Sequence, residues 1–311
     1  FFLVKMTAPM SPKVASVFRP ALFKGRVAIV TGGGTGIGKA ITQELLHLGC
    51  KVMIASRNEE RLKAAAKLMQ DQLTCNTSAE LAHMQCNIRK EEQVKDLISS
   101  TLSRFGKLDF LVNNGGGQFP SPASGISLKG WHAVIETNLT GTFLCCREAF
   151  NQYMADHGGV IVNIIADMWK GFPGMSHTGA ARAGVDNLTK SLSIEWAHHG
   201  VRINSVAPGS SIYSETAAAN YSDPSIFEAT VPLVPAKRLG TVEEVSAAVC
   251  FLLSPAAAFI SGETLRVDAG ASLYSTRWTI PDHNKTPAYK WSTDVGEDDI
   301  ESDSPRTPSK L

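Results

Sequence analysis

Short apolar runs alternate with longer helical stretches along most of the chain, and this alternation limits the possible fold more than any other feature. The apolar runs are 27–30, 52–55, 110–112, 160–165, 201–206 and 265–267. The other stretches carry apolar residues at helical spacing, and they are 36–48, 59–71, 91–104, 130–156, 178–198 and 242–253. Fully apolar strands separated by helices are typical of a parallel sheet covered on both faces. The pattern therefore predicts one α/β domain over residues 25–274.

The two ends of the chain lack this alternation. Residues 1–24 contain three prolines and no sustained periodicity, so we expect an irregular N-terminal arm. Residues 275–311 are polar, and the last twenty of them hold six acidic residues with almost nothing apolar to bury. Such a composition cannot offset the entropy lost on ordering, so we expect a disordered tail.

Charge balance and cysteine usage exclude several classes of function. Thirty basic and twenty-nine acidic residues leave a formal charge of +1, so no overall basic field attracts nucleic acid or an anionic membrane. Six irregularly placed cysteines, none in a Cys-x-x-Cys pair, indicate reduced thiols rather than a disulfide framework. No apolar stretch approaches the roughly 18 to 20 residues that span a bilayer. We expect no metal site.

A glycine-rich turn directly follows the first expected strand and opens the first expected helix. It reads Thr31-Gly-Gly-Gly-Thr-Gly-Ile-Gly38. Glycines let the backbone approach a pyrophosphate, and the N-terminus of the following helix offers unpaired N–H groups in a positive potential. The turn therefore predicts a dinucleotide site formed by Gly32, Gly34, Thr35, Gly36, Ile37 and Gly38.

The end of the second expected strand indicates which dinucleotide binds. An NAD site places a carboxylate there to accept the ribose hydroxyls, whereas this strand ends in Ser56-Arg57. Arg57 can hold a 2′-phosphate through charge-assisted hydrogen bonds, and Ser56 can add a hydroxyl. The sequence favours NADP(H), with a solvated surface arginine as the alternative interpretation of Arg57.

Further motifs follow in order along the chain: Asn113-Asn-Gly-Gly116, then Asn138 in Asn-Leu-Thr-Gly-Thr, then Pro208-Gly209. With the glycine-rich turn, over about residues 24–272, they make the chain similar to the short-chain dehydrogenase/reductase family. The resemblance implies a single Rossmann-type, doubly wound parallel sheet with strand order 3-2-1-4-5-6-7, helices on both faces, and a homo-oligomer, either a dimer or a tetramer. It implies further cofactor contacts at Asn87, Ile88, Asn114, Gly115, Gly116, Pro208 and Gly209.

The chain departs from this family at the catalytic positions. Ile165, Thr178 and Arg182 stand where the usual member has Ser, Tyr and Lys. Ketone reduction creates an alkoxide that must be protonated, and a tyrosine beside a lysine can supply that proton. A threonine hydroxyl does not reach the necessary pKa, and an arginine stays protonated as a donor. Ordinary alcohol–ketone interconversion is therefore disfavoured.

Hydride addition to the β-carbon of an α,β-unsaturated thioester has different requirements. It produces a delocalised enolate, which mainly needs preorganised hydrogen-bond donors at the carbonyl oxygen. Thr178 is the candidate donor, and it is alternatively the N-cap of its helix. Arg182 lies four residues further on and faces the same side of the helix, and by its position it should approach the nicotinamide ribose. The family resemblance implies that Asn138 holds a water and kinks its helix, with a helix-surface asparagine as the alternative.

Two residues on expected loops are weaker candidates for the proton source. Asp167 and Tyr213 follow the fifth and sixth strands at the carboxyl edge, where such sheets bind ligands. For both, an ordinary loop residue is the alternative. We interpret His177 as a solvated loop histidine. Residues 210–234, rich in Ala, Ser and Ile, are the expected substrate loop.

Longer stretches resemble the peroxisomal trans-2-enoyl-CoA reductases, which also lack the Tyr and Lys. These stretches are 113–119, 129–134, 177–185, 235–238 and 251–256. The resemblance implies NADPH-dependent reduction of trans-2-enoyl-CoA to saturated acyl-CoA in fatty-acid elongation or related lipid metabolism. One alternative is a peroxisomal 2,4-dienoyl-CoA reductase, a family that has Lys where Arg182 stands and Tyr where Asp167 stands. Another is a catalytically inactive NADPH-binding partner.

The chain ends in Ser309-Lys310-Leu311. This tripeptide is an address read by the peroxisomal import receptor, and it requires an exposed terminus. An acidic, disordered tail presents it well. The sequence therefore predicts a peroxisomal protein.

Overall fold

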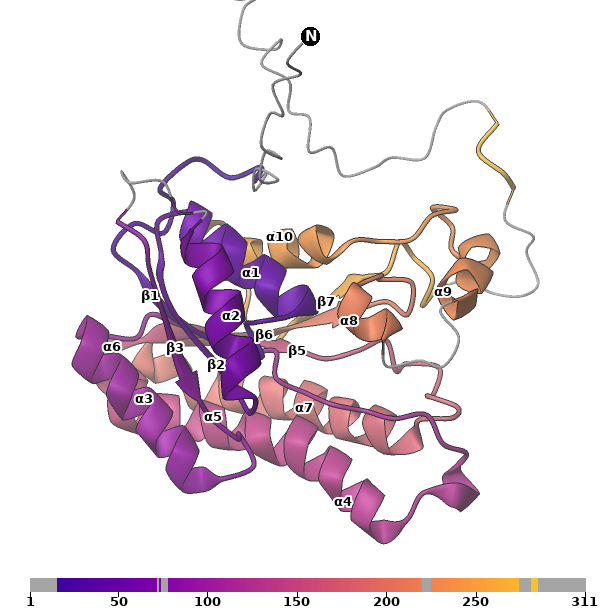
Figure 1. Ribbon diagram of the computed structural model, residues 1–311, viewed down its shortest axis with the longest axis horizontal. Coiled ribbons are helices and arrows are strands. Elements are labelled where there is room, and N and C mark those ends of the chain that lie inside the picture. The colour runs from indigo at the N-terminus through magenta and orange to yellow at the C-terminus, as the bar shows by residue number, and fades with distance from the viewer. Residues whose placement is uncertain (1–15, 72, 74–77, 220–224, 274–280, 285–311) are drawn as a thin grey trace, which may run out of the picture.

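The computed structural model describes residues 16–71, 73, 78–219, 225–273 and 281–284 (Figure 1). Its centre is a seven-stranded parallel sheet in the order β3-β2-β1-β4-β5-β6-β7. This confirms the predicted Rossmann-type class and strand order. The strands are β1 Val27–Thr31, β2 Lys51–Ser56, β3 Glu80–Gln85, β4 Phe110–Asn113, β5 Gly159–Ile164, β6 Val201–Pro208 and β7 Thr264–Val267.

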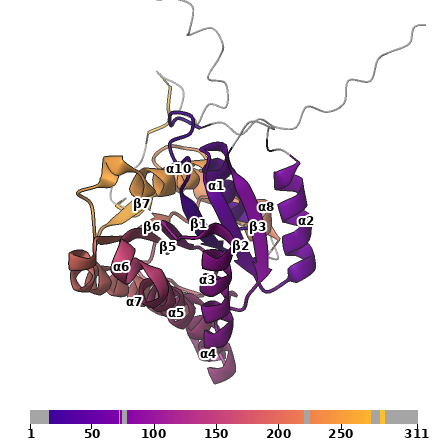
Figure 2. The same ribbon diagram turned by 90° about the vertical axis from the view of Figure 1, so that its left-hand side faces the viewer.

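Helices cover both faces of the sheet, as Figures 1 and 2 show. They are α1 Gly36–His47, α2 Glu59–Gln70, α3 Glu91–Phe105, α4 Leu128–Ile135, α5 Gly141–Ala149, α6 Ala155–His157, α7 Ser176–Glu195, α8 Glu215–Ala218, α9 Ser225–Thr230 and α10 Val242–Leu253. Short 3₁₀ turns lie at Ala123–Gly125, Ala197–His199, Val231–Leu233 and Pro255–Ala257. None of the helices in the described part of the chain has the length and apolar character needed to cross a membrane.

The central strands are buried on both sides because their successive side chains enter two different cores. Ala28 and Val30 of β1 pack in a cluster with α1, α2 and α10, whereas Ile29 between them packs with α3 and α5. This alternation explains why β1 is apolar at nearly every position. Phe23, at the end of the expected N-terminal arm, is also buried and packs edge-on against Phe110.

One strand was not among the apolar runs. β3 lies at the edge of the sheet and pairs with β2 alone, in a register that sets Leu81 opposite Val52. Its sequence, Glu-Leu-Ala-His-Met-Gln, buries only Leu81 and Ala82 fully. An edge strand with few buried positions does not require a continuous apolar run, so the pattern did not reveal it.

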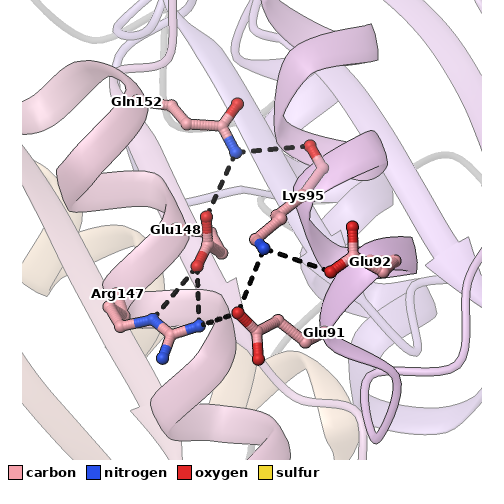
Figure 3. A network of polar contacts seen from close by, with 6 residues as sticks. All are labelled: Glu91, Glu92, Lys95, Arg147, Glu148 and Gln152. Atoms are coloured by element: carbon pink, nitrogen blue, oxygen red, sulfur yellow. Dashed lines mark hydrogen bonds and ion pairs between the residues drawn. The ribbon is translucent and has the colours of Figure 1, made fainter.

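The helix expected at 130–156 runs from Leu128 to His157 and contains two π-helical segments, Glu136–Thr140 and Phe150–Met154. A polar network fastens this helix to α3 (Figure 3). The Arg147 guanidinium lies 2.8 Å from carboxylates of both Glu91 and Glu148, and Lys95 lies 3.1 Å from Glu91. Each exposed pair contributes at most about 1 kcal/mol, so the network fixes alignment more than stability.

Candidate active site

A cavity of 470 Å³ opens at the carboxyl edge of the sheet. β1, β4, β5 and β6 all end there, and the residue after each strand lines the cavity: Gly32, Asn114, Ile165 and Gly209. Parallel sheets of this type bind ligands at this edge, near the point where the strand order reverses. The remaining lining residues are Thr35, Gly36, Ile37, Gly115, Gly116, Gly117, Gln118, Pro120, Ile164, Ala166, Asp167, Phe172, Met175, Arg182, Pro208, Ser210, Ile212, Ser214, Thr216, Phe227 and Thr230.

The glycine-rich turn packs too closely for side chains at two key positions. Gly32 has φ +67°, a left-handed conformation that other residues rarely adopt. A Cβ atom on Gly38 would lie 2.9 Å from the carbonyl carbon of Gly32 and closer still to its oxygen. Thr35, the N-cap of α1, is extended and makes no side-chain cap hydrogen bond. The first amides of α1 therefore keep their donors available at the cavity.

The loop after β4 is fixed to the glycine-rich turn by one threonine hydroxyl. Thr31 Oγ1 accepts hydrogen bonds from the backbone N–H groups of Asn114 at 3.0 Å and Gly115 at 2.8 Å. The Asn114 amide donates back to the Thr31 carbonyl at 3.0 Å. A Cβ on Gly116 would fall 2.5 Å from Nη2 of Arg182 and 2.7 Å from Oδ1 of Asn138. A side chain at position 116 would therefore force Arg182 or Asn138 to move.

Asn138 is fully buried in the first π-helical segment, so the interpretation as a helix-surface asparagine is wrong. Its amide donates to the carbonyls of Gly117 at 2.7 Å and Val134 at 3.0 Å, while Oδ1 accepts from the Gly117 N–H at 3.1 Å. The side chain thus holds Gly117, in the cavity wall, through both of its backbone groups. π-Helical segments occur frequently at functional sites.

Arg182 reaches the cavity from α7. Its Nη1 donates to the Ile164 carbonyl at the end of β5 at 2.5 Å, and Nε has no hydrogen-bond partner. Burial lowers the pKa of Arg182 to about 10, so the guanidinium remains a cationic donor at neutral pH.

Thr178 and His177 lie elsewhere than expected. α7 begins at Ser176 with Met175 as its N-cap, so Thr178 is inside the helix and the N-cap interpretation is wrong. Thr178 is fully buried, its hydroxyl has no partner, and it does not line the cavity. His177 is also in the helix and fully buried, which contradicts a solvated loop histidine.

Asp167 and Tyr213 are placed differently relative to the cavity. Asp167 lines it, and burial together with the negative charge of Asp268 raises the pKa of Asp167. Tyr213 is 41% exposed, packs edge-on against Phe227, and is not part of the wall. Asp167 and Arg182 are the ionisable residues among those described that line the cavity.

Six predicted cofactor residues lie outside the cavity wall: Gly38 is in the first turn of α1, and the other five lie toward β2 and β3. Gly34 packs in the turn against α2. Ser56 ends β2, and Arg57 is exposed beyond it, with its carbonyl accepting a hydrogen bond from Gln85 at 2.9 Å. Asn87 and Ile88 follow β3. These predicted cofactor residues thus continue from the cavity wall along the carboxyl edge of the sheet.

The loops supplied wall residues that no motif marked. Phe172 and Met175 precede α7, and Gln118 and Pro120 lie in the loop after β4. The available signal was their position in the loops that follow β4 and β5, and Gln118 also lies in the stretch 113–119 that resembles the enoyl-CoA reductases. The expected substrate loop contributes Ser210, Ile212, Ser214, Thr216, Phe227 and Thr230 from its described residues.

The wall suits a nicotinamide dinucleotide. The open amides of α1 offer donors for a pyrophosphate, and Gly32, Gly115 and Gly116 leave room that side chains would fill. The described residues contain no group of three or more His, Cys, Asp or Glu side chains arranged to bind a metal.

A family model described as enoyl-(acyl carrier protein) reductase matches residues 32–272. The chain belongs to the short-chain dehydrogenase/reductase family. Among relatives in this family, the peroxisomal 2,4-dienoyl-CoA reductase of Danio rerio is 35% identical, covering 85% of this chain and 87% of that protein. A probable 2,4-dienoyl-CoA reductase of Bacillus subtilis is 36% identical over 79% of this chain and 96% of that protein.

A solved structure gives a further similarity. The citronellol catabolism dehydrogenase AtuB of Pseudomonas aeruginosa PAO1 superposes with a TM-score of 0.72 and 46% identity, covering 83% of this chain and 99% of the other. The chain is an oxidoreductase of this family, and it is similar to enoyl-CoA and 2,4-dienoyl-CoA reductases.

Proposed function

We propose that this protein uses NADPH to reduce the carbon–carbon double bond of a trans-2-enoyl-CoA, giving the saturated acyl-CoA. The observation that carries the proposal is the pair of ionisable groups in the described cavity wall, Asp167 and Arg182. A cationic guanidinium and a carboxyl of raised pKa in the same wall suit an enolate and its protonation better than an alkoxide.

Each wall group has one task in this reaction. Bound NADPH supplies the hydride that reaches the β-carbon. Arg182 stabilises the negative charge that develops on the thioester oxygen, because it is a cation held in a desolvated wall. Asp167 gives the proton that the α-carbon requires, because burial and the charge of Asp268 raise its pKa and so favour the protonated form more than in an exposed aspartate. Hydride and proton together saturate the double bond, and Asp167 is reprotonated from solvent.

The remaining predicted residues bind and orient. Gly32, Thr35, Gly36, Ile37 and Gly38 approach the pyrophosphate, and Asn138 supports the loop of Gly115 and Gly116 through Gly117. Pro208 and Gly209 border the nicotinamide. Ser56 and Arg57 select the 2′-phosphate, with Asn87 and Ile88 beside the adenine. Thr178 and Tyr213 stay candidates for a catalytic role, although neither lines the described cavity.

A second candidate is the reduction of a 2,4-dienoyl-CoA. The names of the Danio rerio and Bacillus subtilis relatives favour it. The chemistry extends naturally, because a dienoyl thioester delocalises the charge over one more double bond and still ends at the oxygen near Arg182. Asp167 then protonates a carbon of the extended enolate, and the carbon chosen sets the position of the remaining double bond.

One assay separates these functions. Purified protein is mixed with NADPH and, separately, trans-2-dodecenoyl-CoA, 2,4-decadienoyl-CoA or 3-oxododecanoyl-CoA, while NADPH absorbance is followed and products are identified by mass spectrometry. We expect rapid oxidation with the enoyl thioester and little with the ketone. Faster turnover of the dienoyl thioester favours the second candidate. Brisk ketone reduction refutes both, and NADPH binding without any turnover indicates an inactive partner.

We also propose a peroxisomal location and a homo-oligomer. The tail bearing Ser309-Lys310-Leu311 lies outside the described residues, and the support comes from the tripeptide itself and from the peroxisomal naming of the Danio rerio relative. Light scattering on the purified protein gives the oligomeric state, and a monomeric mass contradicts that part of the proposal.

A further inference from the structure

Unsatisfied polar atoms concentrate beside the cavity at the start of α7. Six buried side-chain polar atoms in the described residues lack a hydrogen-bond partner, and three of them are Nδ1 and Nε2 of His177 and Oγ1 of Thr178. A fourth is Nε of Arg182, one turn further along. Native proteins pair the large majority of buried polar atoms, so such a group calls for a partner that another state supplies.

His177 is the extreme case because its whole imidazole is buried and neither nitrogen is paired. One neighbour of the imidazole comes from the loop after β4. The Phe119 ring meets it edge-on with centroids 4.5 Å apart, and Phe119 itself is 38% exposed. A partly exposed side chain thus packs directly against this buried imidazole.

The covering segment is short and fixed at both ends. Asn138 holds Gly117 on one side, and the Ser121 N–H donates to the Gly174 carbonyl at 2.7 Å on the other. Gln118 and Pro120, the neighbours of Phe119, line the cavity, and so does Met175 beside the first turn of α7. Displacement of the Phe119 side chain is therefore the movement that would expose His177 to a ligand while the two anchors stay in place.

The chemistry of the missing partner follows from the imidazole. A neutral ring offers one donor and one acceptor on opposite sides, so a group that carries both a donor and an acceptor can pair with whichever nitrogen it reaches. An acyl chain offers neither, and a thioester carbonyl offers only an acceptor. His177 also lies five residues from Arg182, well around the helix from the group assigned to the thioester oxygen. A secondary amide, of the kind found along the pantetheine arm of coenzyme A, offers a donor and an acceptor.

We propose that His177, uncovered by displacement of Phe119, is a positioning residue that hydrogen-bonds a secondary amide of the pantetheine arm. This inference rests on the proposed function, since it assumes a CoA thioester in the cavity. The imidazole stays unpaired in the free protein, and the substrate pairs it. Binding energy from the amide then helps to align the reacting double bond.

The test uses enoyl thioesters of one chain length that differ only in the thiol part. The series is the pantetheine thioester with two amides, the N-acetylcysteamine thioester with one, and the S-ethyl thioester with none. For wild-type protein we expect KM to rise stepwise as amides are removed. For His177→Leu, which keeps a similar volume, we expect KM for the amide-bearing esters to rise about tenfold and KM for the S-ethyl ester to stay unchanged.

Two further variants guard against a merely structural effect. His177→Gln keeps a donor and an acceptor and should retain part of the amide preference. His198→Leu, at an exposed histidine of the 3₁₀ turn after α7, is the matched control and should change nothing. The Leu variant at 177 should also melt a few degrees higher than wild type, because it removes two unpaired buried nitrogens.

A measurement without substrate tests the cover. Diethyl pyrocarbonate should modify His177 slowly in wild type and at least several-fold faster in Phe119→Ala, as judged by peptide mass mapping. Equal modification rates in the two proteins overturn the role of Phe119.

The kinetic series has two further outcomes. A KM increase in His177→Leu that is equal across the ester series, or no amide preference in wild type, overturns the inference alone. A wild-type protein that reduces no thioester refutes the proposed function, and this inference with it.

Discussion

Replacement of Gly38 by alanine tests whether the glycine-rich turn is the dinucleotide site. The new Cβ would lie 2.9 Å from the carbonyl carbon of Gly32, and it would overlap the Gly32 oxygen and the Asn114 amide nitrogen. Ordinary carbon–carbon contacts are about 3.5–4.0 Å, so α1 and the turn must separate by at least about 0.6 Å. The obstructing atoms are backbone, or a side chain that is hydrogen-bonded to backbone, and neither yields cheaply.

Overpacking of this kind costs about 1–3 kcal/mol, which corresponds to a melting temperature lower by roughly 2–12 °C for a domain of this size. The displaced atoms carry the amides that would bind the pyrophosphate, so we expect NADPH affinity to fall by at least about tenfold, or about 1.4 kcal/mol. Fluorescence titration with NADPH and thermal unfolding without ligand measure the two effects separately.

Gly34→Ala is the matched control in the same turn. Its Cβ would make only ordinary contacts, 3.4 Å to Ala65 and 3.5 Å to Leu62. We expect a melting temperature close to wild type and a much smaller loss of NADPH affinity. The reasoning is refuted if Gly38→Ala melts and binds NADPH as Gly34→Ala does, because the close approach of α1 to the turn would then carry no function.

Four further outcomes are expected. Arg57→Asp should move the ratio of kcat/KM values by about tenfold or more from NADPH toward NADH, and unchanged selectivity would mean that the 2′-phosphate lies elsewhere. Asp268→Asn removes a charge that raises the pKa of Asp167, so the alkaline limb of the kcat/KM profile should move to lower pH; an unshifted limb argues against Asp167 as the proton donor. Burial raises the pKa of Glu44 above its unfolded value, so the native state loses stability as pH rises above about 4.5. Glu44→Gln should therefore melt higher than wild type at neutral pH, with the difference shrinking on acidification, as calorimetry across pH can show. A fluorescently tagged chain lacking Leu311 should stay cytosolic, and continued import into peroxisomes would discredit the address.

The elements that could be predicted from sequence are those whose residues are dictated locally. The turn at 31–38 could be predicted because glycine is favoured by the left-handed φ at Gly32 and by the close backbone contact at Gly38. The central strands could be predicted because each of their faces packs into a separate core, which makes their sequences continuously apolar. β3 was missed because an edge strand buries so little.

The candidate site was less predictable because burial there depends on distant parts of the chain. His177 packs against Phe119, which lies in the loop after β4 and is far from α7 in the sequence. The start of α7 was misjudged because a threonine before an alanine-rich stretch is a good N-cap, whereas the helix begins two residues earlier, after Met175. Arg182 could be placed on its helix, but its desolvation depends on the end of β5.

Gly116 connects the features that distinguish this site. Arg182 and Asn138 approach it from α7 and from the π-helical segment, so closely that a Cβ there would force one of them to move. Asn138 lies in the π-helical segment, and its amide donates to the Gly117 carbonyl of the same loop at 2.7 Å. The guanidinium, the loop and the asparagine therefore act as one packed unit. A side chain at position 116 would therefore displace either the arginine that stands in place of the family's lysine or the asparagine that holds the loop.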